Sequence, residues 1–141
     1  MSSKTVKYVT SDSQFHEELN NAGIRLAVVY FSGHWCGPCE LLNPEFERLP
    51  KKYPRAVFIR VDVDKCFDTV AELEISVIPT FILYRNRAKI DRLRGAFLEV
   101  LEGRIKEHIG TGESEAIQEL VDFERMAFKS SQSDTLKKIS F

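Results

Sequence analysis

Two cysteines with a Gly–Pro pair between them lie where an apolar run meets a helical pattern, and this arrangement constrains the fold more than any other feature. Cys36 and Cys39 follow the run at residues 24–31 and open a segment, residues 36–53, whose apolar side chains have helical spacing. A continuous apolar run is typical of a strand that is buried on both faces. At such a strand-to-helix junction, the pair could be metal ligands, a structural disulfide or a redox centre.

The same change between strand-like and helical patterns repeats along residues 6–109. Strands are predicted at residues 6–10, 24–31, 56–63, 79–84 and 88–95. Helices are predicted at residues 11–23, 36–53, 64–75 and 97–109. Crossover helices between the early strands imply parallel pairing, and the polar turn at residues 85–87 closes an antiparallel hairpin. The predicted fold class is therefore α/β, with a central mixed β-sheet.

Prolines and apolar side chains set further expectations for the predicted helices. Pro44 is expected to kink the helix at residues 36–53, and Pro54 is expected to end it. Val70 and Leu73 are expected to be the apolar contacts of the helix at residues 64–75. The last helix carries an apolar face made of Phe97, Val100, Leu101, Ile105 and Ile109.

The character of the sequence changes after Gly110. Residues 1–110 are predicted to form one domain. Residues 111–141 begin with turn residues, contain one weakly amphipathic segment at residues 116–128 and end in a Ser-rich stretch. We expect a C-terminal extension that is partly helical or disordered, because its apolar side chains are too few for a second core.

The composition argues against several classes of function. The formal net charge is -1 and 43% of the residues are hydrophobic, so nothing favours binding to nucleic acid or to an anionic membrane surface. No apolar run reaches the roughly 18 residues that a membrane-spanning helix requires. The first residues lack an apolar signal core, so we expect a cytoplasmic protein, with the nucleus as a further location. In such a reducing compartment, a CxxC pair is more often catalytic or metal-binding than structural.

The cysteine count favours a redox role for the pair. A structural zinc site needs four nitrogen or sulfur ligands, whereas Cys66 and the three histidines are scattered, so no metal is expected. A disulfide that closes so short a loop would constrain the unfolded chain little. The N–H groups and dipole of a helix N-terminus favour a thiolate at Cys36. We therefore expect Cys36 to attack a partner disulfide and Cys39 to resolve the mixed disulfide, with Trp35 as an apolar rim.

The run from Trp35 to Cys39, WCGPC, resembles the active-site motif of the thioredoxin family. Gly37 and Pro38 fill the two positions between the cysteines. The stretches FSGHWCGPC, VDVDKC, IPTFILYRN and RLRGA extend the resemblance over about residues 6–109. Within the family, RLAVVYF, KYPRAVFIRVDV and PTFILYRNRAKID look most like the N-terminal domain of thioredoxin-like protein 1. The resemblance implies a thioredoxin fold, in which about four helices flank the central sheet.

The resemblance also implies a groove for substrates. The peptide bond between Ile78 and Pro79 would be cis and would face the cysteines, with the Ile78 backbone pairing to a substrate strand. The alternative is that Pro79 merely starts a strand. Gly95 would let the backbone approach the groove, or would be a simple turn glycine.

The implied activity is that of a protein-disulfide reductase that contributes to cell redox homeostasis. Its substrates would be proteins with disulfides, and no cofactor would be bound. Electrons would come from NADPH through a separate thioredoxin reductase. We expect a monomer. The alternative is a redox-sensing adaptor or protein-interaction module with weak reductase activity.

Three residues complicate this interpretation. Tyr30 stands where thioredoxins usually carry a buried acid that helps to deprotonate the resolving cysteine. A phenol with an ordinary pKa of about 10 is a poor base at neutral pH, so we expect slow resolution of the mixed disulfide. Glu40 stands where a lysine is common, and a carboxylate disfavours a nearby thiolate. Cys66 is interpreted either as a small buried hydrophobe or as a possible regulatory thiol.

Overall fold

The structure, a computed structural model, describes residues 5–109 and residue 123. Its elements are β1 (Lys7–Val9), α1 (Asp12–Ala22), β2 (Ala27–Ser32), α2 (Gly37–Lys52), β3 (Val57–Asp62), α3 (Phe67–Glu72), β4 (Thr80–Arg85), β5 (Ala88–Arg94) and α4 (Leu98–Ile109). The predicted order of strands and helices is confirmed. The described residues up to residue 108 form one compact unit. The extension predicted at residues 111–141 lies outside the described residues apart from Phe123, so it stays a prediction.

The strands form one mixed sheet with the order β1-β3-β2-β4-β5. β3 pairs in parallel with β1 and with β2, as the crossover helices require. β4 is antiparallel to both β2 and β5. β1 and β5 are therefore the two edges of the sheet, and β2 lies at its centre with a neighbour on each side. The mixed sheet of a thioredoxin fold is confirmed.

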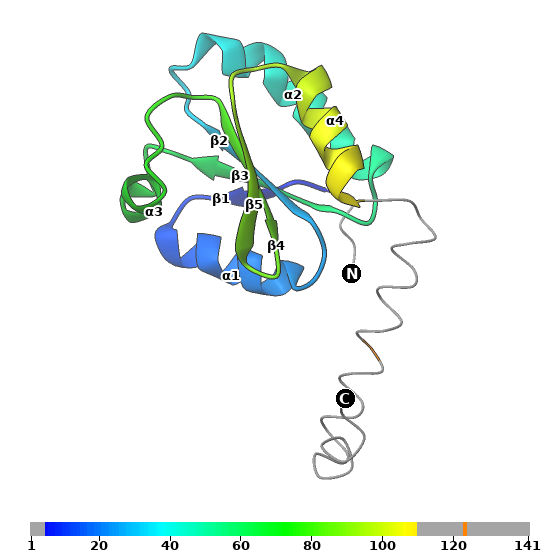
Figure 1. Cartoon of the computed structure of the whole chain (residues 1–141). Coiled ribbons are helices and arrows are strands. Elements are labelled where there is room, and N and C mark those ends of the chain that lie inside the picture. The colour runs from blue at the N-terminus through cyan, green and yellow to red at the C-terminus, as the bar shows by residue number, and fades with distance from the viewer. Residues whose placement is uncertain (1–4, 110–122, 124–141) are drawn as a thin grey trace. The chain divides into compact units, whose positions relative to one another are not determined.

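Helices cover both faces of the sheet. α1 and α3 lie on one side, and α2 and α4 lie on the other (Figure 1). α1 begins after Ser11, whose side chain accepts a hydrogen bond from the Gln14 N–H at 3.2 Å. None of the helices within residues 5–109 is long and apolar enough to cross a membrane.

α2 is a single helix that contains two prolines beyond its first turn. It passes through Pro44 and through Pro50, which the sequence analysis did not single out, and it ends at Lys52. The predicted stop before Pro54 is confirmed, whereas the kink at Pro44 stays a prediction.

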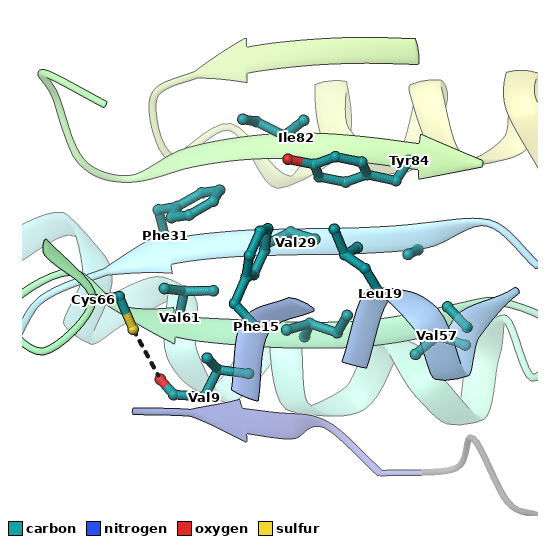
Figure 2. Close-up of a cluster of buried hydrophobic side chains, with 13 residues drawn as sticks. Val9, Phe15, Leu19, Val29, Phe31, Val57, Val61, Cys66, Ile82 and Tyr84 are labelled. Carbon is teal, nitrogen blue, oxygen red and sulfur yellow. Dashed lines mark hydrogen bonds between the residues drawn. The ribbon is translucent and has the colours of Figure 1, made fainter. Parts of the chain in front are cut away.

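The core has two layers because successive residues of β2 point to opposite faces of the sheet. Val29 and Phe31 pack with Phe15 of α1 in a cluster that also contains Cys66 (Figure 2). Tyr30 points to the other layer, where its ring stacks on Phe81 with 5.0 Å between centroids. The second layer holds α2 against the sheet and so fixes the position of the cysteine pair.

Two expectations about helix faces are confirmed only in part. Leu73 at the end of α3 packs against the core cluster as expected, whereas Val70 is only partly buried and the buried side chain of the helix is that of Thr69. The Thr69 hydroxyl and N–H both donate to the Asp12 carboxylate, at 2.6 and 2.8 Å, and this polar contact explains the burial. In α4, Leu101 and Ile105 are buried as the apolar face predicts, Ile109 is half-buried, and Phe97 and Val100 are exposed.

Candidate active site

Cys36 and Cys39 form a disulfide at the N-terminus of α2, with their Cα atoms 5.2 Å apart. Cys36 is the residue that caps α2, and its sulfur accepts a hydrogen bond from the Cys39 N–H at 3.2 Å. An N–H donor and the positive end of a helix dipole both favour negative charge on that sulfur after reduction. The predicted strand-to-helix junction is therefore present, and it suits Cys36 to thiolate chemistry.

Both cysteines are buried, but the residues beside them are exposed. Cys36 is 4% exposed and Cys39 is 1% exposed. Gly37 and Pro38 between them are exposed. The Trp35 side chain is 61% exposed, as expected for an apolar rim. The disulfide therefore lies just beneath a surface to which these three residues contribute.

Asp64 holds the Trp35 ring in place. The indole Nε1–H donates to both carboxylate oxygens of Asp64 at 3.1 Å. The Nδ1 atom of His34 lies 3.1 Å from the same carboxylate. Sequence reasoning missed this anchor, because Asp64 lies in a polar turn with no motif that links it to the tryptophan.

The Ile78–Pro79 peptide bond is cis, as the resemblance implied. A Cβ atom on Gly33 would lie 3.1 Å from Cδ1 of Ile78 and 3.1 Å from the Trp35 ring. Gly33 is thus a glycine because Ile78 and Trp35 approach its backbone from two sides. The cis peptide is thereby placed beside the tryptophan that precedes Cys36.

Gly95 lies on the other side of the cis proline. Its N–H donates to the Pro79 carbonyl at 2.9 Å, and its φ of 106° lies in a region that favours glycine. A Cβ on Gly95 would lie 3.0 Å from Cε2 of Phe97. The glycine permits a tight turn against Pro79 and a close approach of the Phe97 ring, so it is more than a simple turn residue.

Tyr30 lies beneath the second cysteine and is fully buried. Its hydroxyl donates to Asn43 Oδ1 at 2.6 Å and lies 3.5 Å from the Cys39 carbonyl oxygen. Burial raises the pKa of Tyr30 to about 12, although the nearby Arg60 charge acts in the opposite direction. A phenol of this kind holds its proton at neutral pH and cannot serve as a base for Cys39.

Arg60 occupies the neighbouring strand position on β3. Its guanidinium lies 5.7 Å from the Tyr30 ring centroid and 5.5 Å from that of Tyr8, and Nε donates to Ser32 Oγ at 3.1 Å. A pocket of about 210 Å³ opens beside it, lined in part by Ser32 and His34. The pocket leads from the surface toward the carboxyl ends of the parallel strands.

Cys66 is buried away from the disulfide. It is 0% exposed, and its sulfur lies 4.0 Å from the Val9 carbonyl oxygen (Figure 2). Burial raises the pKa of the Cys66 thiol to about 11, and the Asp12 and Asp62 charges act in the same direction. This environment favours the small buried hydrophobe over the regulatory thiol. Within the described part of the chain, no group of three or more His, Cys, Asp or Glu side chains is placed to hold a metal ion.

Known proteins resemble this chain in both sequence and structure. The sequence model of the family described as Thioredoxin matches residues 6–107. Thioredoxin from Equus caballus is 48% identical over 101 residues, which cover 72% of this chain and 96% of the relative. The crystal structure of Schistosoma mansoni thioredoxin has 36% identity and a TM-score of 0.72, covering 76% of this chain and 98% of that one. A chain from the crystal structure of the ferredoxin:thioredoxin reductase and thioredoxin f2 complex has 27% identity and a TM-score of 0.72, covering 76% of this chain and 97% of that one.

Proposed function

Because the chain belongs to the thioredoxin family, we propose that Cys36 is the attacking thiol and Cys39 the resolving thiol of its dithiol–disulfide exchange. The family match and the cysteine pair make the chain a protein-disulfide oxidoreductase. The observation that supports these roles is the hydrogen bond from the Cys39 N–H to the Cys36 sulfur at the start of α2. This donor stabilises a thiolate at Cys36.

The reduced protein supplies both electrons of the reaction. The Cys36 thiolate attacks one sulfur of the substrate disulfide, forms a mixed disulfide and releases the first substrate thiolate, which takes a proton from water. Cys39 loses its proton, attacks the Cys36 sulfur and releases the second substrate thiolate, which is protonated in turn. One protein dithiol is oxidised and one substrate disulfide is reduced.

The resolving step is the slow one in this proposal. Tyr30 keeps its proton at neutral pH because of its burial, and Asn43, which accepts the phenolic hydrogen bond, does not titrate. Cys39 must therefore give its proton to water or to a departing thiolate.

The substrate is a protein with a disulfide, bound as an extended segment beside Ile78. Among the described residues, neither the N–H nor the C=O of Ile78 takes part in the hydrogen bonds of the sheet or of the turns. An unpaired backbone beside the cysteines can pair with one added strand. Ile78 itself is half-buried, so part of its surface is open to an incoming strand.

The electron source we propose is NADPH acting through a separate thioredoxin reductase, with no cofactor bound to this chain. The structure of a similar protein in complex with a reductase supports a reductase partner of some kind. We further propose that the protein works as a monomer in the cytoplasm and the nucleus, that residues 1–110 suffice for activity, and that its nearest functional counterpart is the redox domain of thioredoxin-like protein 1.

The test is turnover of NADPH with thioredoxin reductase and insulin disulfides. We expect the wild type to be active, Cys36→Ser to be inactive, and Cys39→Ser to accumulate a mixed disulfide with insulin on a non-reducing gel. If the wild type is inactive with thioredoxin reductase but active with dithiothreitol, the proposed dithiol–disulfide exchange stands and thioredoxin reductase is rejected as the electron donor.

A wild type that is inactive even with dithiothreitol would favour the adaptor function. The observations behind that alternative are the buried phenol at Tyr30 and the exposed carboxylate at Glu40 in the first turn of α2. A variant with both cysteines changed to serine would then retain every protein partner that the wild type captures. Loss of those partners in the double variant would exclude the adaptor.

A further inference from the structure

Phe97 is exposed to solvent at the N-terminus of a helix, and an aromatic side chain is unfavourable there on both counts. It precedes Leu98, the first residue of α4, and its carbonyl accepts the Leu101 N–H at 3.1 Å, which makes it the N-cap. This position favours Ser, Thr, Asp or Asn, because their side chains accept a hydrogen bond from the first turn. A phenyl ring cannot do so, and the Phe97 side chain is 69% exposed. Conflicts of this kind between residue and local structure are expected at functional positions.

The Phe97 ring is held at the edge of the substrate groove. Cε2 of the ring lies 3.0 Å from the place of a Cβ on Gly95, so the ring rests on the glycine backbone. Gly95 is in turn hydrogen-bonded to the Pro79 carbonyl at 2.9 Å. The ring is therefore held close to the cis peptide bond through Gly95. Because the side chain is already held in place, little conformational entropy is lost when a substrate side chain binds to it.

Other exposed apolar side chains extend the surface on which Phe97 lies. Val77 precedes the cis peptide bond and is 47% exposed, and Val100 is 48% exposed one turn along α4 from Phe97. The Trp35 ring and Ile78 approach Gly33 together. Trp35 is thus near Ile78, and Phe97 is near Pro79 through Gly95, so both rings lie close to the segment to which a substrate strand would pair.

We propose that Phe97 is a specificity-determining residue that binds an apolar side chain of the substrate polypeptide next to its disulfide. The proposal rests on the function proposed above, because it needs a substrate segment beside Ile78. In a strand, side chains alternate between the two faces, so a segment paired to Ile78 presents one set of side chains toward the surface of Phe97. An apolar side chain there removes area of the phenyl ring from water, and a charged one does not.

The experiment compares two oxidised peptides that differ in one residue beside the cysteine, Leu in one and Asp in the other. The reduced full-length chain is mixed with each peptide, and kcat/KM is measured with dithiothreitol as the reductant. We expect the wild type to prefer the Leu peptide by about tenfold. Phe97→Asn and Phe97→Ala should each reduce the preference to within about twofold, and Phe97→Leu should keep most of it.

Two further measurements separate recognition from folding and from chemistry. Phe97→Asn supplies an N-cap and should raise the melting temperature of the protein, so its loss of preference cannot be attributed to unfolding. The rate at which each protein reduces Ellman's reagent, a small disulfide without a polypeptide segment, measures the chemistry of the cysteine pair apart from the preference between the two peptides.

Phe67→Asn is the matched control. Phe67 is 72% exposed at the first turn of α3, and Cys66 beside it contacts β1, whereas Gly95 follows β5 at the opposite edge of the sheet. This variant should keep the preference for the Leu peptide. An unchanged preference in Phe97→Asn, or an equal loss in Phe67→Asn, would overturn the proposal while the chemistry stands. Failure of the wild type to reduce Ellman's reagent would overturn the proposed function as well.

Discussion

At the scale of single residues, the buried thiol of Cys66 should be inert in the folded protein. Alkylation needs a thiolate that the reagent can reach. Cys66 is 0% exposed and its pKa is raised to about 11, because burial penalises the charged form. We expect iodoacetamide at about pH 8 to add at most two groups to the reduced native protein, at Cys36 and then Cys39, and a third at Cys66 only in denaturant. Mass spectrometry of the intact chain counts the adducts. A third adduct under native conditions would support the interpretation of Cys66 as a regulatory thiol.

Also at the residue scale, Tyr30 should matter more for stability than for chemistry. Tyr30→Phe removes the hydroxyl that donates to Asn43 Oδ1 at 2.6 Å, so we expect a loss of about 1 kcal/mol in the free energy of unfolding. Insulin reduction at neutral pH should stay within about twofold, because the phenol is not a base there.

The matched control for Tyr30→Phe is Tyr84→Phe, in the other layer of the core. The Tyr84 hydroxyl is buried and has no hydrogen-bond partner among the described residues, so its removal leaves no acceptor unpaired. A fall in kcat of tenfold or more in Tyr30→Phe alone, measured from about pH 6 to 9, would show that the hydroxyl relays the Cys39 proton.

At the scale of elements, Asp91 connects β5 to α4. Its carboxylate accepts a hydrogen bond from Arg104 at 2.6 Å and lies 2.8 Å from Nε2 of His108. Burial alone would raise the pKa of Asp91, but the hydrogen bonds from Arg104 and His108 outweigh it and lower the pKa. The stabilisation is therefore present above about pH 4 and is lost as the pH falls through the folded-state pKa below that.

Asp91→Asn should lower the free energy of unfolding at neutral pH by about 1–3 kcal/mol, since it weakens charge-assisted hydrogen bonds. Urea unfolding at neutral and acid pH measures the effect, and the difference from the wild type should shrink at acid pH. The control is Glu45→Gln, which breaks the exposed ion pair with Arg48 at 2.7 Å and should cost well under about 1 kcal/mol. Equal effects of the two substitutions would contradict the structural role of Asp91.

The elements themselves could be predicted because burial leaves a periodic trace in the sequence. The run at β2 is continuous because both faces of that central strand are covered. Contacts between distant segments leave no such trace. The Asp12 carboxylate bonds Thr69 across 57 positions, and this contact explains why Thr69 is buried where apolar periodicity selected Val70. Periodicity likewise assigned Phe97 to the apolar face of α4, but it could not show that the face is uncovered at the helix N-terminus.

The sequence likewise predicted only those parts of the active site that belong to short motifs. Cys36 and Cys39 belong to a short motif, so local sequence was enough to find them, whereas the cis bond before Pro79 was implied by the resemblance to the thioredoxin family. Asp64 and Asn43 have no motif, because each acts on a residue that is distant in sequence, Trp35 or Tyr30. Contacts between separate strands and helices therefore set the limit of what the sequence alone could predict.

At the scale of the whole molecule, buried phenols and the buried thiol make the fold sensitive to alkali. Burial raises the pKa of Tyr30 and of Tyr84 to about 12, and Cys66 shifts in the same direction. The folded state therefore binds protons that the unfolded chain has lost. Stability is fully present below about pH 9 and falls as the pH rises through 10 toward 12. Each buried phenol accounts for about 2–3 kcal/mol of this loss when the shift is fully expressed.

Urea unfolding at about pH 8 and about pH 11 measures the loss. Tyr84→Phe tests its origin, because the variant keeps the buried ring and removes a hydroxyl that has no hydrogen-bond partner in the described structure. At pH 8 we expect the free energy of unfolding of this variant to equal that of the wild type or to exceed it by up to about 1 kcal/mol. At about pH 11 the variant should lose less stability than the wild type. If Tyr84→Phe and the wild type lose the same amount between the two pH values, titration of this phenol is not coupled to unfolding. The alkaline loss would then arise at the other groups whose pKa is raised, which include Tyr30, Tyr53 and Cys66.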